Sequence, residues 1–281
     1  MTPIYRTYSI AVCILSFLFT SCDRKFKGVE YEADIVKQLG VRNHEFDTIF
    51  IELLPQINEL MKEVGSDLEI KLSGDFDYHR KEEILLIPLT PYSKNISASS
   101  NIDYRFILLN PDYINTIMYE VMLDTDVFKD IVLLLIIHEL CHFELGKSGQ
   151  FDEIITKSIN DNRSLNGDNY SNFNESKLLE LKVDSLAVSY IQKASLSNNK
   201  NVFSISNSLK KQLKILEASV AIDRITNFYG TPNSNVLNDL SKTHPNFELR
   251  LAFMNYYMNP SESKKRMLDK FIEEREIRLQ N

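Results

Sequence analysis

The chain has 281 residues, 43% of them hydrophobic and 25% charged, which is enough for one large domain or two small ones with a packed core. Its formal net charge of -7 and its pI near 5.4 argue against a nucleic-acid-binding protein, because such proteins carry excess Lys and Arg to neutralise phosphates. Three cysteines in so long a chain exclude a fold held together by several disulfides.

The N-terminus has the pattern of an export signal. Arg6 precedes an uncharged run at 8–19, which is too short for a comfortable transmembrane span and leads into Thr20-Ser21-Cys22. A cysteine directly after small residues resembles the bacterial lipobox, in which that cysteine carries lipid. We therefore predict a lipoprotein signal peptide at 1–21, lipidation at Cys22 and a tether at 22–30. An ordinary cleaved signal and an uncleaved anchor are the alternatives.

The residues after the tether show one helical and three strand-like patterns. Apolar residues at spacings of three and four from Phe50 to Val64 predict an amphipathic helix, with Pro55 inside it, so that the helix either bends there or begins near it. Three strands are predicted, at 68–72, 84–89 and 104–109. A Ser- and Asn-rich stretch at 92–102 predicts a loop, and residues 113–123 predict a connecting helix.

An apolar run at 131–137 leads directly into His138-Glu139-Leu140-Cys141-His142, and this run predicts a buried helix. Two histidines four residues apart lie one turn apart on the same helix face, so both imidazoles can reach one metal ion. Glu139 is close enough to touch a metal-bound water without being a ligand itself. The alternative is a buried helix whose histidines are hydrogen bonded within the core.

The second half of the chain is predicted to be helical. The metal-bearing helix is expected to begin at Thr125 or Asp126 and to end near Gly146. Polar loops at 158–176 and 195–202 flank a helix from about Glu175 to Ile191, and a long helix at 204–228 and a charged C-terminal helix follow. Because no repeat or domain boundary is evident, we predict one domain over residues 31–281, of the α+β class and mostly helical.

A catalytic zinc site needs three protein ligands and one open position for water. A histidine six residues after the second one, as in metzincins, is excluded because Ser148 stands there. In gluzincins a glutamate from a following helix completes the site, and Glu180 is the best candidate, with Glu175 and Glu153 as weaker alternatives. Asp184 lies one turn after Glu180 and can accept a hydrogen bond from a ligand imidazole, which orients the ring. A solvated acidic pair on a surface helix is the alternative for Glu180 and Asp184.

The last polar motif is Thr243-His244-Pro245, followed by Arg250 within a turn and a half if a helix begins there. A histidine and an arginine near a metal can stabilise the negative oxygen that develops when water attacks a carbonyl. The alternative is a helix N-terminal signal with a structural salt bridge. His44 and His79 have no such neighbours and are predicted to be surface residues.

Together and in this order, the three motifs resemble the HtpX and CAAX prenyl protease family of metallopeptidases, and more specifically its soluble exported members. The resemblance covers roughly residues 104–255. It rests on His138-Glu-x-x-His142, Glu180-x-x-x-Asp184-x-x-Ala187 and Thr243-His-Pro-x-x-x-x-Arg250.

This resemblance implies a zincin-like fold with a small sheet beside the metal-binding helix. It implies one zinc ion bound by His138, His142 and Glu180, with Glu139 as the catalytic base. It also implies that Asp184 supports the site and that His244 and Arg250 line it. In zinc hydrolases of this kind, the strand before the metal helix often lies at the sheet edge and pairs with the substrate. Here that would be strand 104–109, and an ordinary core strand is the alternative.

We therefore expect a zinc metalloendopeptidase that cleaves proteins or peptides of the bacterial cell envelope, on its periplasmic or surface face, and is held to the membrane by the lipid at Cys22. Glu139 is expected to take the proton of the attacking water and give it to the leaving amine, and His244 to share the oxyanion with zinc. Two other classes remain open. One is a non-catalytic binding or chaperone-like lipoprotein on a zincin scaffold, and the other is a helical interaction protein that binds no metal.

Overall fold

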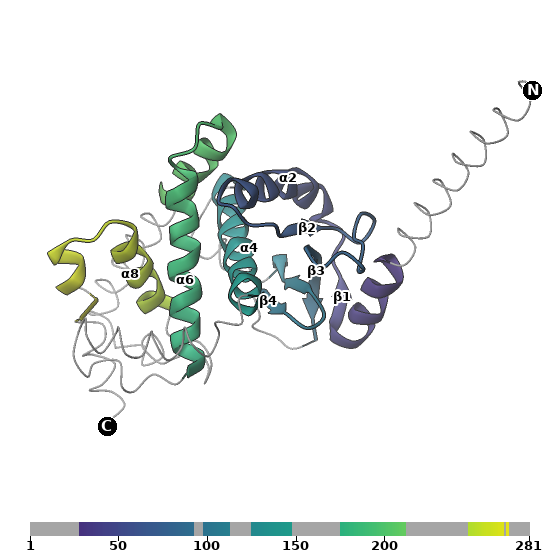
Figure 1. Cartoon of the computed structure of the whole chain (residues 1–281). Coiled ribbons are helices and arrows are strands. Elements are labelled where there is room, and N and C mark those ends of the chain that lie inside the picture. Colours follow the sequence, from purple (N-terminus) through teal and green to yellow (C-terminus); the bar gives the residue numbers. More distant parts are fainter. Residues whose placement is uncertain are drawn as a thin grey trace, which may run out of the picture. The chain divides into compact units, whose positions relative to one another are not determined.

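The computed structural model describes residues 28–92, 98–112, 125–147, 175–211, 247–266 and 268–269 (Figure 1). Several predictions lie outside these residues: the signal peptide at 1–21, lipidation at Cys22, the helix at 113–123, most of the helix at 204–228, and His244. The chain divides into two compact units. One comprises residues up to 62 together with 67–123, and the other comprises 63–66 together with 124 onward. The division into two units does not decide whether residues 31–281 form one domain, which stays a prediction.

The first unit contains a small mixed sheet in which β3 (Glu83–Pro91) is the central strand. Along one side of β3, β2 (Glu69–Lys71) pairs in parallel with its first residues and β1 (Gly40–Arg42) pairs antiparallel with its last. Strand β5 (Phe106–Leu109) pairs with β3 in parallel, and β4 (Ala98–Asn101) pairs with β5 antiparallel. The three strands predicted at 68–72, 84–89 and 104–109 are thus confirmed as β2, β3 and β5.

Two features of the sheet differ from the expectations. Strand β4 falls within the stretch predicted as a loop, because its polar sequence lacks the apolar alternation of a strand and its extended form comes from pairing with β5. The expectation that strand 104–109 lies at the sheet edge is wrong, since β5 is hydrogen bonded to β3 on one side and to β4 on the other. The alternative of an interior strand is the one observed.

Helices pack against this sheet through regularly spaced apolar residues. The helix of residues 28–39 places Tyr31, Ile35 and Val36 against a buried cluster that includes Phe76, Leu85, Ile87, Leu89 and Phe106. Helix α2 (Asp47–Glu63) buries the predicted stripe, namely Phe50, Leu53, Leu54, Ile57, Leu60 and Met61. It begins eight residues before Pro55, so of the two alternatives for the proline the start of the helix is ruled out, and Pro55 lies inside the helix. Asn58 of α2 exchanges two hydrogen bonds with the backbone of Ile70, at 2.8 and 3.0 Å, which satisfies polar groups of β2.

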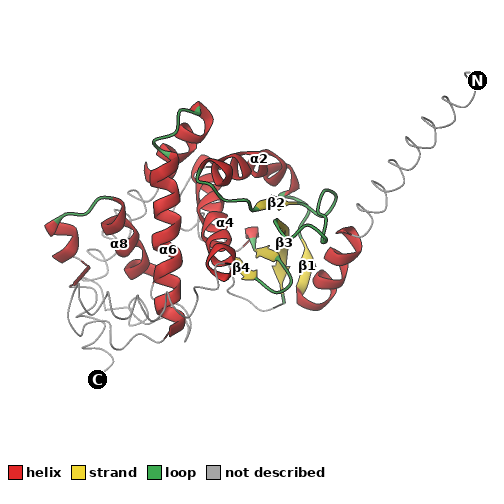
Figure 2. Cartoon of the chain, viewed as in Figure 1, coloured by secondary structure: helices red, strands yellow, loops and turns green. Residues whose placement is uncertain are grey.

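The second unit is helical in the residues described (Figure 2). Helix α4 (Thr125–Lys147) has the predicted bounds, and α6 (Glu175–Ala194) begins where expected and ends three residues later. Helix α8 (Phe247–Met258) follows, and α6 packs against both α4 and α8. The prediction of a mixed α and β, mostly helical fold is confirmed. Among the described helices, none is both long and apolar enough to cross a membrane.

The short segment Glu63–Ser66 belongs to the helical unit. Gly65 has a φ of 87°, the left-handed conformation in which glycine commonly ends a helix, and here it follows α2. Lys193 of α6 donates a 2.7 Å hydrogen bond to the carbonyl of Val64, and Ser66 donates one to the carboxylate of Glu144 on α4. This turn is therefore held by both of the helices that carry the candidate metal ligands.

Candidate metal centre

Helix α4 presents two histidines from successive turns. His138 is buried, and the His142 side chain is 12% exposed. Their ring centroids lie 5.0 Å apart with an interplanar angle of 85°, so the rings are close but not stacked. Because the apolar residues before them fix α4 in the core, the two imidazoles are held at this separation by the buried helix.

Helix α6 brings a carboxylate to both rings. Glu180 Oε2 lies 3.3 Å from His138 Nε2, and Glu180 Oε1 lies 3.4 Å from His142 Nε2. One ligand atom from each of the three residues lies within 4.8 Å of the others, which is the arrangement of a group that could bind a single metal ion. The predicted ligand set is therefore brought together in a buried cluster. Of the weaker alternatives, Glu153 and the side chain of Glu175 lie outside the described residues.

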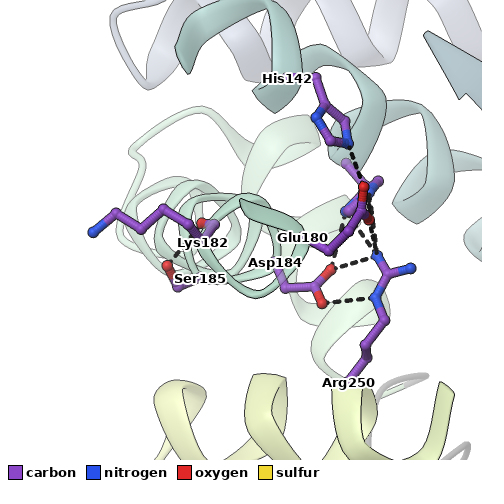
Figure 3. Close-up of polar contacts among 7 residues, drawn as sticks. His142, Glu180, Lys182, Asp184, Ser185 and Arg250 are labelled. Carbon is purple, nitrogen blue, oxygen red and sulfur yellow. Dashed lines mark hydrogen bonds and ion pairs between the residues drawn. The ribbon is translucent and has the colours of Figure 1, made fainter. Parts of the chain in front are cut away.

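One turn after Glu180, Asp184 lies 3.0 Å from the other nitrogen of the same ring, His138 Nδ1. A carboxylate that accepts a hydrogen bond from Nδ1–H leaves the lone pair of Nε2 available to a metal. The predicted role of Asp184 in orienting a ligand imidazole is consistent with this contact. Figure 3 shows that Glu180, Asp184 and Arg250 meet on one side of α6, whereas Lys182 and Ser185 point away from them.

Arg250 of α8 completes the cluster through a two-pronged ion pair. Its Nε and Nη2 atoms donate to Asp184 Oδ2 and Oδ1, each at 2.8 Å. Nη2 also lies 3.5 Å from Glu180 Oε2, and 3.1 and 3.2 Å from the two ring nitrogens of His138. Since the two ring lone pairs diverge, one N–H cannot bond well to both, and the guanidinium contacts the imidazole as a whole.

The ion pair between Asp184 and Arg250 was not predicted from the sequence. Both residues were predicted to lie at the site, but with separate roles. Two opposite charges assigned to one buried site were a signal that they would pair, because a buried carboxylate needs a partner. The same pair ties α6 to α8, as Glu180 and the histidines tie α6 to α4.

The surroundings shift the ionisation of these groups strongly. Burial and the charge of Arg250 lower the pKa of His138, but its hydrogen bonds with Asp184 and Glu180 outweigh them and raise this pKa to about 9. Burial raises the pKa of the Glu180 carboxyl, but the two histidines and Arg250 outweigh it and hold this pKa far below its usual range. Burial likewise opposes ionisation of Asp184, whose pKa is nevertheless lowered by the charge and hydrogen bonds of Arg250. Without a metal, the His138 imidazole is therefore protonated on both nitrogens and positively charged at neutral pH, beside two ionised carboxylates.

The charges of the site fit a divalent cation. Three carboxylates, from Glu139, Glu180 and Asp184, are buried in this cluster with one guanidinium, from Arg250. When both imidazoles are neutral, as metal binding requires, two negative charges remain to be balanced. A doubly charged ion at the three convergent ligand atoms would balance them, and it would replace the proton that His138 holds.

Glu139 is buried on α4 directly after His138, and its negative charge is among the influences that raise the pKa of Arg250. It thus lies next to His138 in the chain without being one of the three candidate metal ligands. Cys141, between the two histidines, is fully buried, and burial raises the pKa of its thiol well above the usual range. His244 and Cys22, the remaining predicted site residues, lie outside the described residues.

No protein-family model, curated protein or solved structure matches the chain. The assignment of a function therefore depends on the residues of this site and on the order of the motifs that supply them.

Proposed function

We propose that the protein is a zinc-dependent endopeptidase of the gluzincin type, similar to the HtpX and CAAX prenyl protease family, that hydrolyses proteins of the bacterial cell envelope. The observation that carries the proposal is the convergence of His138, His142 and Glu180 from two helices at one buried point, with Glu139 adjacent. A surface helix with a solvated acidic pair would not bury both Glu180 and Asp184 against histidines.

Zinc is the metal that this ligand set favours. Two imidazole nitrogens and one carboxylate are a common set in catalytic zinc sites, and three protein ligands leave one tetrahedral position open. A zinc ion bound there would supply Lewis-acid chemistry toward water and a substrate carbonyl. The described residues include no fourth His, Cys, Asp or Glu that joins the cluster to close it.

The residues of the chain have distinct parts in the proposed reaction. Glu139 accepts the proton of the attacking water and delivers it to the leaving amine as the peptide bond breaks. Asp184 holds His138 in one orientation, and Arg250 holds Asp184 through two hydrogen bonds. His244 stabilises the oxyanion, by the same reasoning that placed it near the site from sequence.

The proposed localisation follows from the N-terminal sequence pattern. A lipid at Cys22 anchors the mature chain to the membrane, and the envelope proteins within reach are its substrates. The charge of the chain and its sequence motifs offer no support for a nucleic-acid partner.

Metal content and peptide cleavage, measured on the same purified protein, test the proposal. The wild type is expected to hold one zinc ion per chain and to cleave a peptide library. Glu180→Ala is expected to lose the metal, because two imidazoles alone bind zinc weakly, and Glu139→Gln to keep the metal and lose cleavage. Zinc without cleavage in the wild type would favour a binding protein, and a wild type without bound zinc would refute the metal centre.

A further inference from the structure

We propose that an exposed aromatic and aliphatic patch on the first unit rests on the lipid bilayer beside the anchor. The patch comprises Val29, Tyr78, Ile102 and Tyr104, and we name it the exit patch because these residues lie on the helix that begins at Gly28 and on two segments joined to it by contacts. The inference depends on the proposed lipid at Cys22 and goes beyond the peptidase chemistry. The partner of the exit patch is the surface of a phospholipid bilayer, such as one of phosphatidylcholine.

The short tether is the first support. It is shorter than the predicted 22–30, because residues 28–30 belong to the helix of residues 28–39. Only residues 23–27 lie between Cys22 and Gly28, so even a fully extended tether would span about 20 Å. Gly28 itself is buried and packs closely against backbone, since a Cβ there would collide with the carbonyl oxygens of Ser73 and Phe76. Gly28 therefore has a fixed place in the first unit, and a lipid at Cys22 would keep that place within a few residues of the bilayer.

Contacts among neighbouring residues bring the exit patch together around this point. Tyr31, one turn after Gly28, stacks on Phe76 with ring centroids 5.9 Å apart, and its hydroxyl donates to the carbonyl of Tyr104. Arg105 donates to the carbonyls of Tyr78 and Arg80, which joins the segment 78–80 to the turn at 102–105. These contacts bring together the helix that carries Val29, the segment that carries Tyr78 and the turn that carries Ile102 and Tyr104.

The chemistry of the exit patch suits the boundary between lipid and water. Tyr104 is 61% exposed and Val29 is 50% exposed, although burial of such side chains is favourable. Tyrosine has an apolar ring and a polar hydroxyl, a combination enriched where membranes meet water. Two exposed basic residues, Arg80 and Lys81, are outnumbered by three exposed acidic residues, Glu30, Asp75 and Asp103, so the surface around the patch has no excess of positive charge. The contact is therefore expected to depend on the rings and aliphatic groups and to be insensitive to salt.

The absence of tryptophan from the sequence makes a direct test possible. The mature chain, acylated at Cys22, is placed in phosphatidylcholine vesicles with or without brominated acyl chains, since bromine quenches tryptophan fluorescence on contact. Tyr104→Trp introduces a single reporter into the exit patch. The matched control is Tyr92→Trp, because Tyr92 is 67% exposed and belongs to the same unit. Arg105, next to Tyr104, contacts the first residue of β3, whereas Tyr92 follows its last residue, and a strand of nine residues spans about 30 Å.

We expect brominated lipid to cause a loss of fluorescence for Tyr104→Trp that is absent for Tyr92→Trp and unchanged by added salt. Vesicle-bound protein in which the two reporters respond alike would overturn the exit patch and leave the anchor intact. A chain that does not float with the vesicles would overturn the anchor, and the exit patch with it. If the tryptophan at position 104 becomes shielded from solvent when the protein dimerises in detergent, the patch is a contact between two copies of the chain. This result would also overturn the proposal. Zinc content and peptide cleavage of the same preparations test the peptidase separately.

Discussion

Removal of the metal should make the stability of the protein fall with rising pH in a defined window. In the absence of metal the pKa of His138 is about 9 in the folded protein, against 6.5 for an unperturbed imidazole. Because the folded state holds the proton more tightly, this proton contributes fully to stability below about pH 6.5 and not at all above about pH 9. A pKa difference of this size corresponds to about 3 kcal/mol of the free energy of unfolding.

The assay is urea unfolding of chelator-treated protein, followed by circular dichroism at a series of pH values from about 6 to 10. We expect the free energy of unfolding to drop by about 3 kcal/mol over this range in the metal-free wild type. Zinc-loaded protein is the first control, since a ligand imidazole is already neutral and has no such proton to lose. His138→Gln is the second, because it removes the titrating ring. A flat profile for the metal-free wild type, or an equal drop in His138→Gln, would refute the reasoning.

Three further predictions follow from buried groups and backbone geometry. Arg250→Leu is expected to lower the free energy of unfolding by about 3–5 kcal/mol because it leaves Asp184 buried without its cation, and the double variant with Asp184→Asn should recover part of this loss. Cys141 is expected to resist a thiol-alkylating reagent in the native protein and to react once urea unfolds it, since the thiol is fully buried with a raised pKa. Gly65→Ala is expected to cost about 1–2 kcal/mol because the residue has a φ of 87°.

Each of these has a clear contrary outcome. Additive losses in the Arg250 and Asp184 double variant would show that the two side chains do not act as a pair. Labelling of the native thiol at the rate of the unfolded one would place Cys141 at the surface. For Gly65, the matched control is Gly74→Ala, where an added Cβ meets no atom within 4 Å and φ is not positive, and equal effects at both positions would contradict the backbone argument.

The parts of the fold that were predicted correctly are those that a local pattern specifies. The stripe from Phe50 to Met61 repeats at helical spacing, and α2 buries it as expected. The residues of β3 from Glu83 to Leu89 are continuously buried, as an apolar run predicts. The candidate metal ligands were also predictable, because the spacing of His138 and His142 fixes their geometry and Glu180 was the best candidate among the later carboxylates.

The features that were missed depend on partners distant in the sequence. Strand β4 has the composition of a loop and is extended because β5 offers its backbone. The interior position of β5 follows from that same pairing, so one error caused the other. Arg250 and Asp184 are 66 residues apart, and no local pattern links them.

Helix α6 is joined to two other helices by carboxylates that face different neighbours, Glu180 toward α4 and Asp184 toward α8. The attachment to α8 requires no ion, because Arg250 supplies its positive charge from within the chain. We therefore expect the metal-free protein to stay folded and to bind a metal ion again without refolding. Small zinc domains differ, because they unfold when the metal is removed. Under the proposed function, the chain would fold and reach the membrane before it binds zinc, and peptide cleavage would begin only where the ion is supplied.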